Sequence, residues 1–570
     1  MSSASATPSE PLPKFWREVE CWLLVLFVAL SFGLRLGDLT IRGEETRRAL
    51  IAREMLDTGD WLVPRTQGQP LLSRPPLQNW IIAGISMVQG QINEWTVRLP
   101  SILSIFATAL LVYAYARSFL SKLGAFASGM VFSSLGQVIE LGRFGETDAM
   151  FTLFVAGSLL VWHLGFLRNW NPYLTWCLGY GLAALGTLTK GPQAPVYFVS
   201  IVGMTLLIKW RAGYAFKLAH LAGIALFAVL VGAWQIPFMK TLGSDAGGDI
   251  YVSDVGHRFL DATWGSFLEH FAEYPLELLA CLLPWSALFV VWNRPGFRQS
   301  LSGKWPQVGF QITAILVAFP SVWLPPGSRP RYFMSLYPCV ALLLGATIDR
   351  LAFAAADAEW RRIWPWFLRG CSIAIGAVGI AILGVSVVDA GVWFAQPITF
   401  ALAYCTATSL ASARLWRLAT DGREPAFRAA IVTIAGFVAL TQVGVMINAH
   451  LSTTPNTIAA VQELKELLPP GTRLVSMNMA HHMFVFHYGE VPFVKWPESG
   501  YDVPDDLEYF CVDARELDGK KLPFEWKEVF VVPCTKHKVQ LYQLRMIIGR
   551  RISRQPAADD ALANAEIDLE

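Results

Sequence analysis

The sequence predicts an α-helical polytopic membrane protein with about thirteen transmembrane helices, followed by a small α/β domain at the C-terminal end. Three observations support this fold class. Of the 570 residues, 54% are hydrophobic and only 16% are charged, whereas soluble globular proteins carry about a quarter charged residues. Apolar runs recur along most of the chain, and the 22 tryptophans suit a protein with two membrane interfaces. The net charge of +2 gives no reason to expect a nucleic-acid partner.

Each transmembrane helix is predicted from an apolar run of about 20 residues, which is enough to cross the hydrocarbon core. The first run, Cys21 to Leu36, follows a polar leader at 1–19 and has no small-residue cleavage pattern after it. It is therefore expected to stay as a helix rather than act as a signal peptide. The predicted helices, which define a transmembrane domain over 20–448, lie near 20–38, 97–116, 124–141, 149–166, 173–189, 193–208, 219–237, 275–292, 308–324, 332–348, 367–388, 396–412 and 428–447.

The basic residues of the loops predict how the chain crosses the membrane. Cytoplasmic loops are enriched in Lys and Arg, and one alternate set of loops carries most of these residues. With that set inside and an odd number of helices, the N-terminus lies in the cytoplasm. The loops at 39–96 and 238–274, and everything after residue 448, then lie outside the cytoplasmic (inner) membrane. The set contains Lys14, Arg17, Arg117, Lys122, Arg168, Lys209, Arg211, Lys217, Arg294, Arg298, Lys304, Arg350, Arg361, Arg362, Arg414, Arg417 and Arg423.

The segment 449–550 has the character of a small external α/β domain. Residues 457–468 have helical periodicity, and short runs with strand character follow at 473–476, 507–512, 528–532 and 539–544. The polar, acidic tail at 551–570 is expected to be disordered. Six of the eight cysteines lie in apolar runs. The other two, Cys511 and Cys534, could form a disulfide if their strands are neighbours and the compartment is oxidising.

The predicted external face carries basic residues that work against the topology signal and so need another explanation. They occur near the membrane surface, together with the acids Glu44, Glu45 and Asp148. Such cations suit an anionic lipid headgroup beside an acid or base catalyst. The alternative is ordinary snorkelling and ion pairing in loops. The cations are Arg42, Arg47, Arg48, Arg53, Arg65, Arg74, Arg143, Lys190, Arg258, Arg329 and Arg331.

The first external loop is predicted to contain an amphipathic helix over residues 44–58 that lies along the membrane surface. Two acids at its start favour the positive end of the helix dipole, and Gly59 is a natural end point. Glu44 and Arg47 share a face, which would place a carboxylate beside a phosphate-binding guanidinium. The alternative is a pair of Glu44 with Arg48 that only stabilises the helix.

A second segment of the same loop, Leu71 to Trp80, contains Arg74 followed by two prolines. Pro75 disfavours helical geometry at Arg74, so this guanidinium is presented from a rigid, extended segment. The alternative is a turn before an interfacial helix, with Trp80 and Trp95 as interface anchors.

Several segments match, in order, the motifs of a known family. They are Glu44 to Arg47, Ala52 to Leu56, Gly59 to Pro64, Arg74 to Trp80, Asn93 to Pro100, Arg143 with Asp148 to Met150, Leu188 to Pro192, His257 to Phe259, Leu282 to Ser286, and Pro330 to Tyr332 before Tyr337 and Pro338. On these residues the chain resembles the lipid A aminoarabinose transferases and their bacterial relatives, within the polyprenyl-phosphate-dependent glycosyltransferases that include the protein O-mannosyltransferases. The match covers roughly residues 40–340 and favours a lipid-phosphate site over snorkelling.

The resemblance implies a C-type glycosyltransferase fold and an inverting transfer of one sugar at the external membrane surface. The donor would be a polyprenyl-phosphate-linked sugar, and the acceptor a lipid A-like lipid, a glycan or a protein of the envelope. No nucleotide cofactor and no nucleic acid are expected. The catalytic residues implied are Glu44, Glu45 and Asp148, and the residues implied to bind the lipid phosphate are Arg47, Arg74, Lys190, Arg258 and Arg331.

The chain departs from the family pattern at four places. The family's aromatic residue after the first-loop Arg is Arg48 here, and its His before the Arg-Phe pair is displaced or missing, with Asp254 and His257 nearby. The other two departures lie in the first loop. Glu44 stands where the family usually has Asp, and Ser73-Arg74 replaces its Glu-Lys. Arg74 can still hold a phosphate, but Ser73 cannot replace a carboxylate ligand, which argues against a divalent metal.

Two other interpretations stay open. A transporter or flippase of a lipid-linked sugar would show mirrored broken helices and charges near midspan, which the sequence lacks. The change at Glu44 gives some weight to an inactive scaffold.

Overall fold

The computed structural model describes residues 14–72, 74–243, 263–355, 358–388, 394–453, 456–534 and 544–553. The chain forms two compact units. The larger comprises Met1–Leu39, Leu72–Ile81 and Arg98–Leu451, and the smaller comprises Thr40–Leu71, Ile82–Val97 and Ser452–Glu570. Most of the predicted first loop at 39–96 therefore folds with the C-terminal domain, whereas the sequence analysis assigned it to the transmembrane domain.

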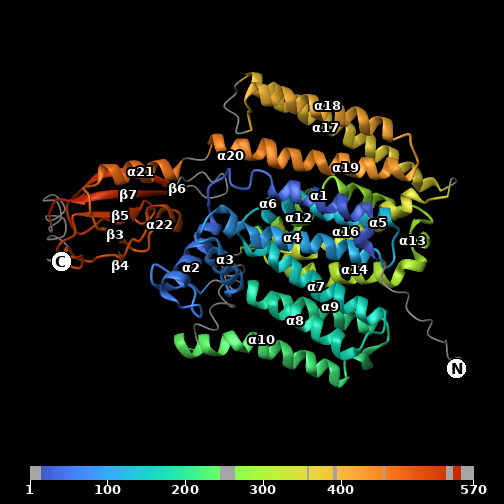
Figure 1. Ribbon diagram of the computed structural model, residues 1–570, viewed down its shortest axis with the longest axis horizontal. Coiled ribbons are helices and arrows are strands. Elements are labelled where there is room, and N and C mark those ends of the chain that lie inside the picture. Colours follow the sequence, from blue (N-terminus) through green and yellow to red (C-terminus); the bar gives the residue numbers. More distant parts are fainter. Residues whose placement is uncertain are drawn as a thin grey trace. The chain divides into compact units, whose positions relative to one another are not determined.

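The larger unit is a bundle of helices, many of which run side by side (Figure 1). Three helices, α3 (Leu77–Gln89), α4 (Glu94–Ala116) and α20 (Ile447–Thr453), contain residues of both units. Short 3-10 turns include η3 (Trp285–Asn293) and η5 (Pro330–Leu336), and η7 (Thr441–Met446) is a π-helix. The other helices are α1 Val19–Gly33, α5 Lys122–Ser133, α6 Gly136–Gly142, α7 Thr147–Leu167, α8 Pro172–Lys190, α9 Gln193–Ile208, α10 Leu218–Leu242, α12 Trp264–Cys281, α13 Phe297–Ser300, α14 Trp305–Ala318, α15 Pro320–Trp323, α16 Tyr337–Ala352, α17 Ile363–Val388, α18 Ile398–Leu418 and α19 Glu424–Leu440.

Seven helical stretches in the described residues are long and apolar enough to cross a membrane, and there are eight if one bent pair forms a single span. Two shorter apolar helices, α1 and α9, add to them. A multi-pass membrane protein is thereby confirmed, and each predicted range contains helical segments. The count of about thirteen spans stays a prediction. The stretches are Glu94–Ala116, Thr147–Leu167, Leu218–Leu242, Ser302–Trp323, Pro330–Ala352, Glu359–Val388 and Glu424–Leu467.

Some predicted spans are not single helices; the range 124–141, for example, contains α5 and α6. In the range 275–292, α12 ends and η3 begins, and the two axes differ by 110°. The break falls at Leu282 to Pro284. Proline has no N–H to continue the ladder of helical hydrogen bonds, so an apolar run with Pro284 at its centre does not stay straight.

Small residues let two central helices of the bundle approach closely. A Cβ atom on Gly345 of α16 would lie 1.9 Å from the Ser128 hydroxyl and 2.8 Å from the Gly124 carbonyl, both on α5. In an apolar solvent, helix association depends on such close packing rather than on exclusion of water. Any larger residue at position 345 would force α5 and α16 apart.

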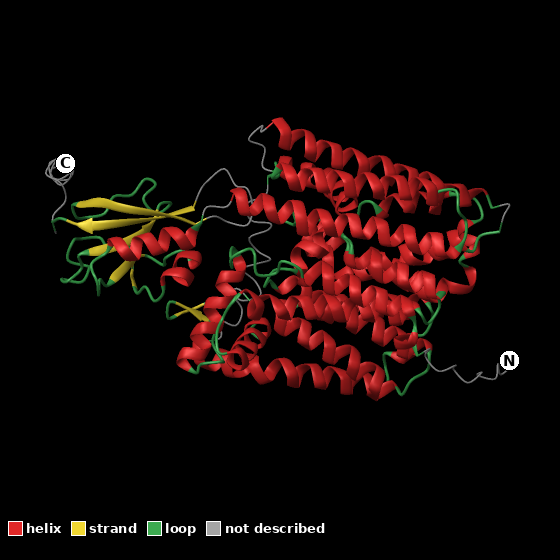
Figure 2. Ribbon diagram, turned by 45° about the horizontal axis from the view of Figure 1, so that its top comes forward, coloured by secondary structure: helices red, strands yellow, loops and turns green. Residues whose placement is uncertain are grey.

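The smaller unit is built on a five-stranded mixed sheet, whose strand order is β4-β3-β5-β7-β6. Figure 2 draws its strands in yellow. β3 runs parallel to β4 and β5, whereas β7 is antiparallel to both β5 and β6. The predicted strand at 539–544 falls mainly outside the described residues. The elements are β3 Leu474–Met477, β4 Phe493–Val494, β5 Tyr509–Asp513, β6 Trp526–Cys534 and β7 Leu544–Arg551, with α21 Thr457–Leu467 and α22 His482–Tyr488.

The two faces of this sheet are covered differently. Alternate strand residues, such as Cys511 and Ile548, pack in one core with α21 and α22. Their neighbours, such as Phe510 and Val512, pack in a second core with side chains of the connecting segments. The small α/β domain predicted at the C-terminal end is therefore confirmed, and its external position stays a prediction.

The conditional disulfide between Cys511 and Cys534 does not form. Both thiols are free and buried. Cys511 lies on β5 and Cys534 ends β6, and β7 lies between these strands. The two strands are thus not neighbours, which was the condition for the bridge. Burial raises the pKa of each thiol to about 12, so both stay protonated and unreactive.

Candidate active site

Asp148 and Lys190, two of the predicted site residues, form a buried ion pair in the larger unit. Lys190 Nζ donates a hydrogen bond to Asp148 Oδ1 at 2.6 Å, and their side chains are 9% and 5% exposed. Asp148 lies in the first turn of α7, and Lys190 is the last residue of α8. Each charge therefore also complements the dipole at its end of the helix. Gly191, with φ of 114°, ends α8 at this point.

Arg331 and Arg74 add two further cations to this pair. Arg331 Nη1 donates to Glu146 Oε2 at 2.9 Å. The charges of both arginines act on Asp148 and on Lys190, so all of them lie within electrostatic reach of one another. The structure thus brings together four predicted residues from segments far apart in the sequence. We call Arg74, Glu146, Asp148, Lys190 and Arg331 the charge cluster.

The charge cluster contains three cations and two carboxylates. The Tyr332 ring lies against two of the cations, with Lys190 Nζ 5.3 Å and the Arg331 guanidinium carbon 5.8 Å from its centroid. Aromatic faces stabilise cations without neutralising them. The cluster can therefore hold an anionic group such as a phosphate.

Glu146 was missed by the sequence analysis. It lies two residues before Asp148 and is the N-cap of α7. The matching motif contains Arg143 and Asp148 to Met150 but not Glu146, so nothing in it pointed to this residue. The only available signal was a second acid two residues before Asp148.

The acidic pair of the first loop lies in the smaller unit. It opens α2 (Glu44–Thr58), which confirms the predicted helix, and Gly59 ends the helix with φ of 72°. Glu44 pairs with Arg47 at 2.9 Å, the i,i+3 arrangement rather than the alternative with Arg48. Both side chains stay accessible, at 40% and 31% exposure. Glu45 is buried, and its carboxylate accepts a hydrogen bond from the Arg42 backbone N–H at 3.0 Å.

The remaining predicted residue, Arg258, lies outside the described residues, as do Ser73, Asp254 and His257. Within the part of the chain that the structure describes, no group of three His, Cys, Asp or Glu side chains is arranged to hold a metal ion.

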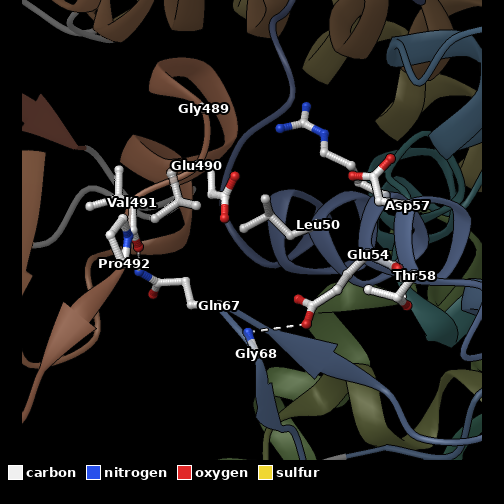
Figure 3. A pocket seen from close by; sticks show the side chains of 12 residues that line it. Leu50, Glu54, Asp57, Thr58, Gln67, Gly68, Gly489, Glu490, Val491 and Pro492 are labelled. Carbon is white, nitrogen blue, oxygen red and sulfur yellow. Dashed lines mark hydrogen bonds between the residues drawn. The ribbon is translucent and has the colours of Figure 1, made fainter. Parts of the chain in front are cut away.

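A pocket of about 460 Å³ lies in the smaller unit, between α2, the β1–β2 hairpin (Arg65–Thr66 and Gln69–Pro70) and the turn at 489–492 (Figure 3). Three carboxylates line it, those of Glu54, Asp57 and Glu490. Glu54 accepts a hydrogen bond from the Gly68 N–H at 3.0 Å, and burial raises its pKa. None of the predicted site residues lines this pocket.

Comparison with known proteins places the architecture in a class. The structure superposes on that of ArnT from Cupriavidus metallidurans bound to undecaprenyl phosphate with a TM-score of 0.68. The superposition covers 95% of this chain and 99% of that one, at 17% sequence identity. The apo structure of the same protein gives a TM-score of 0.67 at 16% identity, covering 93% and 98% of the two chains. The chain therefore has the C-type glycosyltransferase fold, as the motifs implied.

The sequence comparisons identify particular relatives. Residues 73–235 match the family model of dolichyl-phosphate-mannose-protein mannosyltransferases. An undecaprenyl phosphate-alpha-4-amino-4-deoxy-L-arabinose arabinosyl transferase of Pseudomonas fluorescens is 30% identical over 346 residues, which are 58% of this chain and 57% of that protein. A protein of the same description from Aeromonas salmonicida is 26% identical over 382 residues, 64% and 65% of the two chains.

These matches confirm the resemblance to the aminoarabinose transferases that the motifs indicated, and they do not favour a transporter. The chain spans less than two thirds of the length of the two curated relatives, 57% and 65%.

The buried ion pair predicts a stability effect that depends on both of its members. Removing one member leaves an uncompensated buried charge, which costs about 3 to 5 kcal/mol. Lys190→Met and Asp148→Asn should each lower the thermal unfolding temperature of the detergent-purified protein. The double variant should lose less than the sum of the two, because the charges are removed together.

The matched control is Arg423→Met, which breaks the exposed pair with Asp421. This variant should unfold at close to the wild-type temperature. Additive losses in the double variant would show that Asp148 and Lys190 do not stabilise each other.

Proposed function

We propose that the chain is a glycosyltransferase that moves a single sugar from a polyprenyl-phosphate donor to an acceptor of the cell envelope. The acceptor is a lipid A-like lipid, a glycan or a protein. The observation that carries the proposal is the charge cluster, because three cations gathered within a helical bundle suit a lipid-borne phosphate. The undecaprenyl phosphate bound to ArnT of Cupriavidus metallidurans, which shares this fold, supports the choice of donor.

In the proposed reaction, an oxygen of the acceptor attacks the anomeric carbon of the donor sugar from the face opposite the phosphate. The bond between that carbon and the phosphate oxygen breaks, and its electron pair goes to the carrier phosphate. The negative charge that develops there is stabilised by Arg74, Lys190 and Arg331. A guanidinium suits this task because it binds two phosphate oxygens at once. Attack from the opposite face inverts the anomeric carbon.

The acceptor proton needs a carboxylate, and the two candidates differ in their surroundings. Asp148 is hydrogen-bonded to Lys190 and almost fully buried. Glu44 is accessible and pairs with the Arg47 guanidinium. In the proposal, one of these two carboxylates accepts the proton, and Asp148 also positions Lys190. Glu45, which is bonded to the backbone at Arg42, holds the start of α2.

The proposal includes an orientation in the cytoplasmic membrane. The loops rich in Lys and Arg lie inside, and the first loop and the residues after 448 lie outside. The acceptor molecules would then lie at the outer surface of this membrane.

The charge cluster predicts that activity falls to different extents when Arg74 is replaced by Ala and by Lys. In an assay with purified protein and lipid-linked donor, Arg74→Ala should lower kcat/KM by about 10² to 10³. Arg74→Lys should keep part of the activity, because an ammonium supplies the charge without the planar fork. The control is Arg417→Ala on α18, an exposed arginine of the same unit, which should stay near normal. Equal losses in the alanine variants at 74 and 417 would contradict a phosphate site at Arg74.

Measuring activity and unfolding temperature together distinguishes the role of Glu44 from that of Asp148. Glu44→Gln should lower kcat by about 10² to 10⁴ without changing the unfolding temperature, because Glu44 is accessible and acts on the proton. Asp148→Asn should lower both, because it also breaks a buried pair. Full activity in both variants would remove the proposed mechanism.

The orientation predicts the behaviour of a fused reporter. A reporter that is active only in the cytoplasm, fused after Leu451, should be silent, since this position follows an odd number of spans. A reporter fused within the leader at 1–19 should be active. A bright signal after Leu451 would mean that the number of spans is even.

A further inference from the structure

Two adjacent amide side chains at the start of α3 are buried without hydrogen bonds. Gln78 and Asn79 are both 0% exposed. Neither the nitrogen nor the oxygen of either amide has a hydrogen-bond partner within the described part of the chain. Both residues belong to the larger unit and lie in the first helical turn after Arg74-Pro75-Pro76.

Unpartnered amides at buried positions are rare, because burial removes the water that would otherwise satisfy them. The same unit shows the usual outcome at Gln396, which is also buried. Its Nε2 donates to the Phe394 and Val445 carbonyls, and its Oε1 accepts from Asn448 Nδ2. At Gln78 and Asn79, a partner from outside the chain would satisfy all the amide atoms.

The position of these amides links them to the charge cluster. Gln78 is four residues from Arg74, so their Cα atoms are at most about 14 Å apart even in an extended chain. Arg74 in turn acts electrostatically on Asp148 and Lys190. The first turn of α3 also presents backbone N–H groups that lack partners in the helix, which makes this end favourable for a ligand that carries negative charge.

The hydrogen-bond donor and acceptor of each amide indicate which part of such a ligand it binds. Each amide has a donor NH₂ and an acceptor oxygen, whereas a phosphate offers acceptors only. A phosphate would therefore leave both amide oxygens unpaired. A sugar hydroxyl both donates and accepts, and so can satisfy both atoms. Adjacent helical residues project about 100° apart, so the two amides can contact different hydroxyls of one ring.

We propose that Gln78 and Asn79 bind hydroxyl groups of the donor's sugar, next to the phosphate held by Arg74, and so determine which sugar is accepted. This inference rests on the proposed function, since it assumes a lipid-linked sugar as donor. It assigns specificity to the start of α3, whereas the charge cluster binds the part of the donor that is common to all such lipids.

The test measures binding of defined lipids to the full-length protein in nanodiscs. The probes are bare undecaprenyl phosphate and a panel of undecaprenyl-phosphate-linked sugars that includes 4-amino-4-deoxy-L-arabinose and mannose. Wild-type protein should bind one sugar-bearing lipid more tightly than the bare one. Gln78→Leu and Asn79→Leu should each weaken binding of that lipid by about tenfold or more and leave binding of bare undecaprenyl phosphate unchanged.

Thermal unfolding separates a binding role from a structural one. If the amides are unpartnered in the free protein, both leucine variants should unfold at or above the wild-type temperature. The matched control, Gln396→Leu, should unfold at a lower temperature and keep the wild-type sugar preference.

The outcomes distinguish the two levels of the proposal. Leucine variants that keep the wild-type preference, or a wild-type protein that binds bare and sugar-bearing lipids equally, would overturn the sugar subsite alone. Leucine variants with a lowered unfolding temperature and an unchanged preference would show that the amides bind internal water. A wild-type protein that binds no lipid of the panel would overturn the proposed function as well.

Discussion

A charge inside an apolar helical bundle is stable only beside an opposite charge, and the pair of Asp148 with Lys190 meets this constraint. The two residues come from opposite ends of neighbouring helices, so the pair can form only when α7 and α8 lie side by side. Arg74 and Arg331 reach the same place from segments far away in the sequence. The charge cluster is thus a product of the whole bundle rather than of any local motif.

The free protein leaves this region incompletely satisfied. The amides of Gln78 and Asn79 have no hydrogen-bond partner among the described residues. This costs stability in the absence of a ligand, because buried polar groups need partners. In such a site, a bound ligand supplies the hydrogen-bond partners that the folded protein alone lacks. Such a conflict with stability is typical of functional sites.

The sequence predicted those features that depend on neighbours along the chain. Apolar runs located the helices, and two acids with a glycine located α2 from Glu44 to its end before Gly59. Features that depend on distant partners were not predictable in the same way. The pairing of Arg331 with Glu146 and the place of β7 between β5 and β6 both follow from long-range packing. The 110° bend after α12 is an intermediate case. Pro284 marks its place in the sequence, but the apolar run around it predicted one continuous span.

The C-terminal domain, whose role the sequence left open, supports the first loop within the smaller unit. His482 at the start of α22 donates a hydrogen bond from Nε2 to the carbonyl oxygen of Gly43 at 2.9 Å. Gly43 is the N-cap of α2, with φ of 59°, and directly precedes Glu44. Farther along α2, Arg53 lies over the Phe486 ring at 4.6 Å, which adds a second attachment to the same short helix. The direction in which Glu44 leaves the backbone is therefore fixed by a residue more than four hundred positions later in the chain. A C-terminal domain that holds the first loop in this way explains why Glu44 and Arg47 have a defined position although their side chains stay accessible.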